Sequence, residues 1–192
     1  MIRPLLCAAA LAAAIVAGPA QALALVGSGG SAGSLTDYSG EGLLSFDAEF
    51  TGSAGRIVAT YAIEAGDLLA PVDFNALLLN FTGEGLGGYV LSLSAGQFGG
   101  AGTVTRQFGG STAVTGLGGG TLTLDFDTPE FFDVEVGDVF GTPGRANWLV
   151  DFSGLQVGDQ VRLAVSAVPE PGTLVLAATL LGMTLLGRHR RG

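Results

Sequence analysis

The amino-acid sequence predicts an all-β fold, with an antiparallel β-sandwich in the middle of the chain. Short runs of β-branched, aromatic and aliphatic residues recur there, separated by glycine and polar turn residues. Glycine is frequent, at 33 of 192 residues, and long charge-rich amphipathic patterns typical of helices do not occur. These features favour a jelly-roll or an immunoglobulin-like sandwich and leave the choice between the two open.

The chain begins with a pattern typical of a secretory signal peptide, predicted as a helix within residues 1–24. Arg3 precedes a long apolar run, which Gly18 and Pro19 end. Small residues suited to signal cleavage follow, so we expect a cut after Ala22 or Ala24 and export of the remaining chain.

Residues 25–40 are rich in glycine and serine, which predicts a flexible leader. The sandwich is then expected to cover residues 41–167. Within it, the glycine-rich segments Gly96–Gly102 and Gly116–Gly120 predict loops.

Nine runs within residues 41–167 predict strands. In two of them apolar residues alternate with others, so that one face is expected to be buried: Ile57, Ala59, Tyr61 and Ile63 in the first, and Leu122, Leu124 and Phe126 in the second. The segment Ala76–Leu79 also fits a short helix, and that alternative stays open. The nine runs are Leu43–Phe50, Arg56–Glu64, Phe74–Phe81, Tyr89–Ser94, Thr103–Phe108, Thr121–Phe126, Phe131–Val136, Asn147–Phe152 and Gln160–Ser166.

The charge of the middle excludes nucleic acid as a partner. Between residues 25 and 168, sixteen carboxylates face four arginines and no lysine, a formal charge of −12. Such a domain repels phosphates. The only cysteine, Cys7, and the only histidine, His189, lie in the terminal segments, so the middle carries no disulfide, no thiolate or imidazole catalyst and no Cys/His metal site.

Residues 172–187 form a stretch of sixteen residues without a charge. As a helix it would span about 24 Å, slightly less than a ~30 Å hydrocarbon core, and flanking arginines can snorkel to the interface. We therefore expect a transmembrane helix in the inner membrane. Residues 188–192 form an arginine-rich terminus, expected on the cytoplasmic side by the positive-inside bias; its basic cluster is Arg188, His189, Arg190 and Arg191.

Val168, Pro169, Glu170 and Pro171 stand directly before this apolar stretch. The order of motif, apolar stretch and basic terminus, over residues 168–192, resembles the PEP-CTERM sorting signal. The resemblance implies an exosortase-like processing enzyme of Gram-negative bacteria that make extracellular polysaccharide, removal of the tail, and delivery to the cell surface or matrix. Because two prolines restrict the backbone and remove hydrogen-bond donors, we expect an extended, accessible motif just outside the bilayer.

The densest acidic stretch supplies the candidate metal ligands Asp125, Asp127, Glu130 and Asp133. Ca²⁺ prefers six to eight oxygen ligands, which carboxylates can provide, although a solvated strand face explains the same pattern without a metal. No other cofactor is expected. Asp125 and Asp127 would also share one strand face, as a glycosidase pair does, but every i, i+2 pair of a strand has this spacing.

These observations predict a non-enzymatic structural protein of the cell surface or extracellular matrix, because the middle lacks the usual catalytic bases. The alternative is a carbohydrate- or calcium-binding adhesion module, and a glycoside-active enzyme is less favoured. For Trp148, apolar neighbours favour a place in the core. The rings that could stack on sugars are Trp148, Tyr38, Tyr61 and Tyr89.

Overall fold

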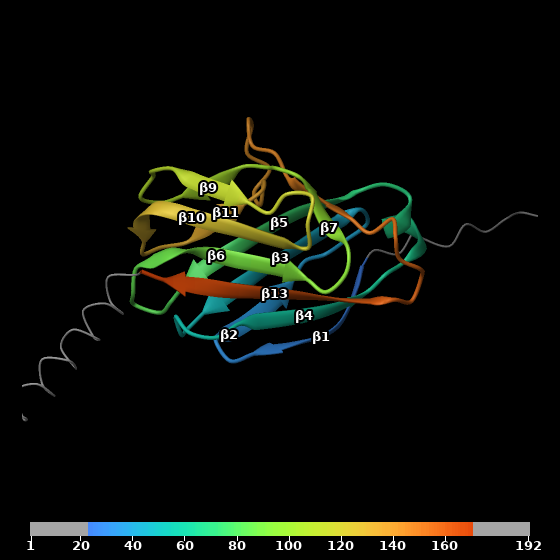
Figure 1. Ribbon diagram of the computed structural model, residues 1–192, viewed down its shortest axis with the longest axis horizontal. Coiled ribbons are helices and arrows are strands. Elements are labelled where there is room, and N and C mark those ends of the chain that lie inside the picture. The colour runs from blue at the N-terminus through green and yellow to red at the C-terminus, as the bar shows by residue number, and fades with distance from the viewer. Residues whose placement is uncertain (1–22, 171–192) are drawn as a thin grey trace, which may run out of the picture.

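Residues 23–170, which the computed structural model describes, form an all-β domain of two facing sheets (Figure 1). One short 3-10 helix, η1 (Ala65–Leu68), connects the fourth and fifth strands. The first sheet has the order β1 (Ala24–Gly30), β4 (Ile57–Ala62), β13 (Gln160–Pro169), β6 (Leu86–Leu93), β10 (Thr121–Glu130) and β9 (Thr112–Thr115). The second has the order β2 (Gly33–Asp37), β3 (Leu43–Phe50), β5 (Val72–Asn80), β11 (Val134–Val136) and β8 (Val104–Arg106), with β12 (Trp148–Asp151) pairing with β5 and β7 (Gln97–Gly100) pairing with β12.

Each of the nine predicted runs overlaps a strand, and β3 has the predicted bounds. Ala76–Leu79 lies inside β5, so the helix alternative is wrong: its neighbours β3 and β11 bind its backbone on both sides. The pairing of β3 with β5 is parallel, which departs from the predicted antiparallel arrangement. The choice between a jelly-roll and an immunoglobulin-like topology stays a prediction.

The structure corrects the prediction of a flexible leader over residues 25–40. These residues form β1 and β2, which pair antiparallel with β4 and β3. A glycine- and serine-rich segment is flexible in isolation, but the open edges of β4 and β3 supply unpaired backbone groups that bind it. For the same reason the predicted loop Gly96–Gly102 contains β7, which lies along β12, and the unpredicted β9 lies along β10.

The core lies between the two sheets. Phe50 on β3 and Tyr89 on β6 meet across it, with ring centroids 5.4 Å apart. Trp148 is fully buried, as predicted, and its indole N–H donates to the carbonyl oxygen of Thr103 at 3.1 Å. The predicted inward faces are also confirmed, with Phe126 half-buried and the other members buried.

The last strand, β13, lies in the middle of the first sheet between β4 and β6 and ends at the left of Figure 1. Its start and its end therefore mark the two ends of the sandwich. No helix within residues 23–170 is long and apolar enough to cross a membrane. Two predicted helices lie outside the described residues: the transmembrane helix over 172–187, and the signal helix within residues 1–24 except for its last two residues.

Candidate functional site

The four carboxylates predicted as calcium ligands do not converge on one point. Asp125 and Asp127 are exposed on β10, whereas Glu130 at the end of that strand is buried and Asp133 is half-buried in the following turn. The pairing of β10 with β6 is irregular between Asp125 and Glu130, and this turns the last carboxylate inward. Within residues 23–170 no group of three or more His, Cys, Asp and Glu side chains is arranged to hold a metal ion. Calcium binding stays a prediction.

The structure instead brings Asp127 and Glu130 together on Arg106, the last residue of β8. One terminal nitrogen of Arg106 donates to Asp127 Oδ1 at 3.0 Å and to the carbonyl oxygen of Ser111 at 3.0 Å. The other donates to the carbonyl and hydroxyl oxygens of Thr128. Arg106 Nε lies 3.5 Å from Glu130 Oε2. The guanidinium, which extends from β8 of the second sheet, is therefore held by carboxylates and carbonyls of β10 in the first sheet and of the loop before β9.

This ion pair is desolvated. The side chains of Arg106 and Glu130 are 2% and 1% exposed, and the guanidinium lies over the ring of Phe126 at 4.4 Å from its centroid. An arginine in such a place is stable because carboxylates, carbonyls and an aromatic face replace most of its water. Its Nε is one of the buried polar atoms within residues 23–170 that lack a hydrogen-bond partner. Sequence reasoning missed Arg106; its one signal is that the middle of the chain contains only four basic residues.

Hydrogen bonds keep Asp127 ionised. The backbone N–H and the hydroxyl of Ser111 donate to its Oδ2 at 3.0 and 2.9 Å, and these bonds, with that of Arg106, hold the pKa of Asp127 well below its usual range. A glycosidase acid needs the opposite shift, because it must carry a proton near neutral pH. Asp127 is therefore unsuited to the acid role of the Asp125–Asp127 pair considered from the sequence.

Glu130 also fixes three exposed phenylalanines. Its Oε1 accepts the backbone N–H groups of Phe131 and Phe132, both at 3.1 Å, and its Oε2 accepts that of Phe108 at 3.2 Å. The three side chains are 61%, 51% and 55% exposed for Phe108, Phe131 and Phe132. The ring of Phe108 lies 5.1 Å from that of Phe132 and 6.2 Å from that of Phe131. We call Phe108, Phe131 and Phe132 the aromatic platform.

The sequence alone did not reveal the aromatic platform. The run Phe131–Val136 predicts a strand, in which one of the two rings would be buried. In the structure the strand β11 begins only at Val134. The carboxylate of Glu130 instead accepts the backbone N–H groups of Phe131 and Phe132 in the turn before it. Of the four rings considered for sugar stacking, Tyr38 alone is exposed; the other three are in the core.

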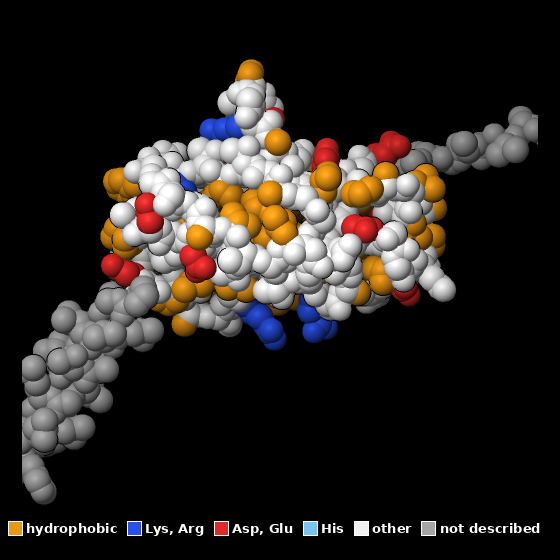
Figure 2. Space-filling view, turned by 45° about the horizontal axis from the view of Figure 1, so that its top comes forward, with side chains coloured by type: hydrophobic (Ala, Val, Ile, Leu, Met, Phe, Trp, Pro, Cys, Tyr) orange, Lys and Arg blue, Asp and Glu red, His pale blue; other side chains and the backbone are white. Residues whose placement is uncertain are grey.

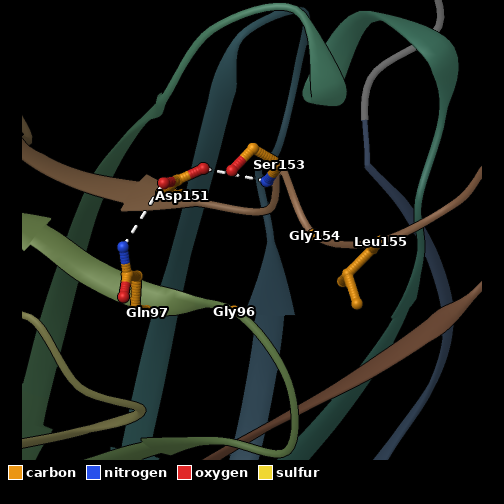
Figure 3. A pocket seen from close by; sticks show the side chains of 6 residues that line it. All are labelled: Gly96, Gln97, Asp151, Ser153, Gly154 and Leu155. Carbon is orange, nitrogen blue, oxygen red and sulfur yellow. Dashed lines mark hydrogen bonds between the residues drawn. The ribbon is translucent and has the colours of Figure 1, made fainter.

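A pocket of about 360 Å³ lies between the loops that follow β6 and β12 (Figure 3). Asp151 lies at its wall, where it accepts the backbone N–H of Ser153 at 2.8 Å and the side-chain amide of Gln97 at 3.4 Å. The bonds from Ser153, backbone first, lower the pKa of Asp151. Gly96, Gly154 and the apolar side chain of Leu155 complete the lining. The pocket thus presents an ionised carboxylate, an amide and a hydroxyl beside one apolar side chain.

The sequence predicted as a sorting motif begins within the sheet. Val168 and Pro169 belong to β13 and lie opposite Gly88 and Leu86 of β6. The backbone N–H of Glu170 then donates to the carbonyl oxygen of Gly85 at 3.4 Å. Val168 and Pro169 are thus extended and half-buried within the sheet, whereas the prediction that the motif is accessible just outside the bilayer stays a prediction. Pro171 and the basic cluster Arg188–Arg191 lie outside the described residues.

No protein-family model, curated protein or solved structure matches the chain.

Proposed function

We propose that the chain is an exported structural protein of the cell surface or extracellular matrix, processed by an exosortase-like enzyme. It would reach the inner membrane through its signal peptide, pause there on the apolar segment 172–187, and be released or transferred outward after cleavage. The β-sandwich is the part that remains, and no enzymatic role is assigned to it.

One observation carries this proposal: the last strand of the domain, β13, ends inside the motif, at Pro169. β13 supplies the central strand between β4 and β6, and only one residue of the motif, Pro171, follows the described chain. A cut at or after Glu170 leaves all strand pairings of the described domain in place. Removal of the tail would therefore separate the domain from the membrane without unfolding it.

The pairing of Val168 and Pro169 also limits where a processing enzyme can act. A protease needs several extended residues free of other hydrogen bonds, and in this chain β6 binds the first two residues of the motif. We expect cleavage on the C-terminal side of Glu170, or after local opening of the β13–β6 end.

Mass spectrometry of the protein from its native host tests the proposal, with inner-membrane, surface and medium fractions analysed separately. We expect a surface or medium species that begins at Leu23 or Leu25 and ends near Pro169–Pro171. An intact C-terminus confined to the inner membrane refutes processing and leaves an anchored periplasmic domain. A Glu170→Ala variant should accumulate uncleaved, whereas Glu84→Ala, an exposed acid outside the motif, should be processed normally.

A second candidate function, carbohydrate binding by an adhesion module, is favoured by the pocket in Figure 3. Neutral sugars are bound by carboxylate, amide and hydroxyl groups that converge beside an apolar surface, and Asp151, Gln97, Ser153 and Leu155 provide this combination. A glycan array probed with the wild type and with an Asp151→Ala variant tests the idea. Binding lost in the variant supports it; a wild type that binds no glycan excludes it for the array's sugars.

A further inference from the structure

The aromatic platform lies at the same end of the domain as the sorting motif. A methyl group placed on Gly85 would lie 2.8 Å from Cζ of Phe131, so the two residues are in contact. The carbonyl oxygen of the same Gly85 accepts the N–H of Glu170. Figure 2 shows hydrophobic side chains, with acidic ones beside them, at this left-hand end of the molecule. The chain therefore leaves the domain beside the platform.

Chain length then restricts how far the platform can be from the apolar segment. Only Pro171 separates Glu170 from Gly172, the first residue of the uncharged stretch. Two extended residue steps cover at most about 7 Å. The polar headgroup layer on each side of a bilayer is roughly 5–8 Å thick. If residues 172–187 cross the membrane, Gly85 and the platform beside it must reach the headgroups.

We propose that the aromatic platform docks the domain on the lipid headgroup layer while the tail is anchored. This inference rests on the proposed membrane insertion of residues 172–187. The partner is the bilayer surface itself, and the contact holds the sandwich upright on its C-terminal end until processing removes the tail.

The construction of the platform suits that environment. Aromatic rings are favoured in the interfacial layer, but a backbone N–H that loses water there without a new acceptor is costly. The N–H groups of Phe108, Phe131 and Phe132 are already bound by Glu130, and the charge of Glu130 is balanced by Arg106. The rings can therefore enter the headgroup layer without leaving backbone donors or a bare charge behind them.

The charges around the platform restrict the lipid. Glu84 is exposed next to Gly85, and Asp133 directly follows Phe132, whereas Arg106 is buried behind the rings. Among residues 23–170, the acids beside the platform are therefore accessible to a headgroup, whereas Arg106 is not. We infer a preference for zwitterionic over anionic headgroups, because like charges repel at the surface.

A tryptophan placed on the platform reports the contact. The full chain with Phe132→Trp is reconstituted into phosphatidylcholine vesicles whose acyl chains are brominated near the headgroup, which quenches nearby indoles. Leu69→Trp is the matched control: Leu69 is 86% exposed and follows η1 at the other end of the sandwich, about 30 Å away by the length of β13. Trp148, buried in the core, gives the same background in all variants.

We expect both variants to float with the vesicles, and the added indole to be quenched and blue-shifted in Phe132→Trp but not in Leu69→Trp. Phe108→Trp provides a second reporter, should Phe132→Trp fail to fold. Flotation without quenching at either platform position overturns the docking alone, and the platform then faces water, a polymer or another copy. A chain that does not float refutes membrane insertion and, with it, both proposals.

Discussion

Replacing Arg106 by alanine is expected to be the most destabilising single change among the charged residues of the domain. The substitution removes the partner of Glu130, whose side chain is 1% exposed, and the guanidinium bonds to the carbonyl oxygens of Ser111 and Thr128. It also removes the cation over the ring of Phe126. The remaining carboxylate stays buried with three backbone N–H donors but without a counterion.

Removing one partner of a buried ion pair typically costs about 3–5 kcal/mol. The three N–H bonds to Glu130 lessen the cost, while the lost carbonyl bonds and the cation–π contact add to it, so we expect about 4 kcal/mol. Domains of this size are stable by only about 5–15 kcal/mol. With a urea m-value of roughly 2 kcal/mol per M, the unfolding midpoint should fall by about 2 M.

Urea unfolding of residues 23–170, followed by far-ultraviolet circular dichroism, measures this shift. Arg162→Ala is the control, because Arg162 is exposed on β13, and it should change stability by less than about 0.5 kcal/mol. The Arg106→Ala/Glu130→Gln double variant should lose less unfolding free energy than the two single variants lose together, because it leaves no unpaired buried charge. A loss below about 1 kcal/mol in Arg106→Ala would show that the pair is solvated, and the account of the platform's support would fail.

Three further outcomes are expected. Gly137→Ala should lower the free energy of unfolding, measured by heat or urea, by about 3 kcal/mol. The φ of Gly137 is +82°, and the new methyl group would lie 2.7 Å from Cβ of Asn75. The control Gly118→Ala, with φ +78° but open space around the methyl group, should lower it by about 1 kcal/mol. Hydrogen bonds lower the pKa of folded Asp127, so its contribution to stability is present above about pH 4 and is lost as the pH falls further. The melting temperatures of wild type and Asp127→Asn should therefore converge in acid. Asp125→Asn is the exposed-carboxylate control. Millimolar Ca²⁺ should leave the melting temperature unchanged, since two of the four candidate carboxylates are held by N–H donors; a rise of several degrees would instead support the calcium site.

Most of the strands could be predicted because burial imposes a pattern of period two on the sequence. Ile57, Ala59 and Tyr61 alternate with half-buried residues on β4, and Leu122 and Leu124 alternate with exposed or half-buried residues on β10. The strands that were not predicted lack a clear alternation of buried and exposed residues. β1 is exposed along its whole length and β9 has no buried residue, so both are specified by backbone pairing to a neighbour rather than by their own side chains.

The candidate site was predictable only in part. The acidic stretch of β10 was visible in the sequence, but the fate of each carboxylate was not, because it depends on a residue from another strand. Arg106 lies 21 residues before Asp127 and reaches it only through the packing of β8 against the end of β10. The sequence likewise contained Phe108 and the Phe131–Phe132 pair without any sign that one buried glutamate would join them.

The all-β class, the acidic character of the middle and the order of VPEP, apolar stretch and basic terminus follow from the sequence alone. Composition, periodicity and linear order are local properties of a chain. Only the tertiary structure decided which edges recruit the glycine-rich residues 24–37, where Val168 and Pro169 bind, and that Glu130 and Arg106 support an aromatic platform beside the end of the last strand. Those features depend on contacts between residues far apart in the chain, and such contacts exist only when both sheets are closed over the core.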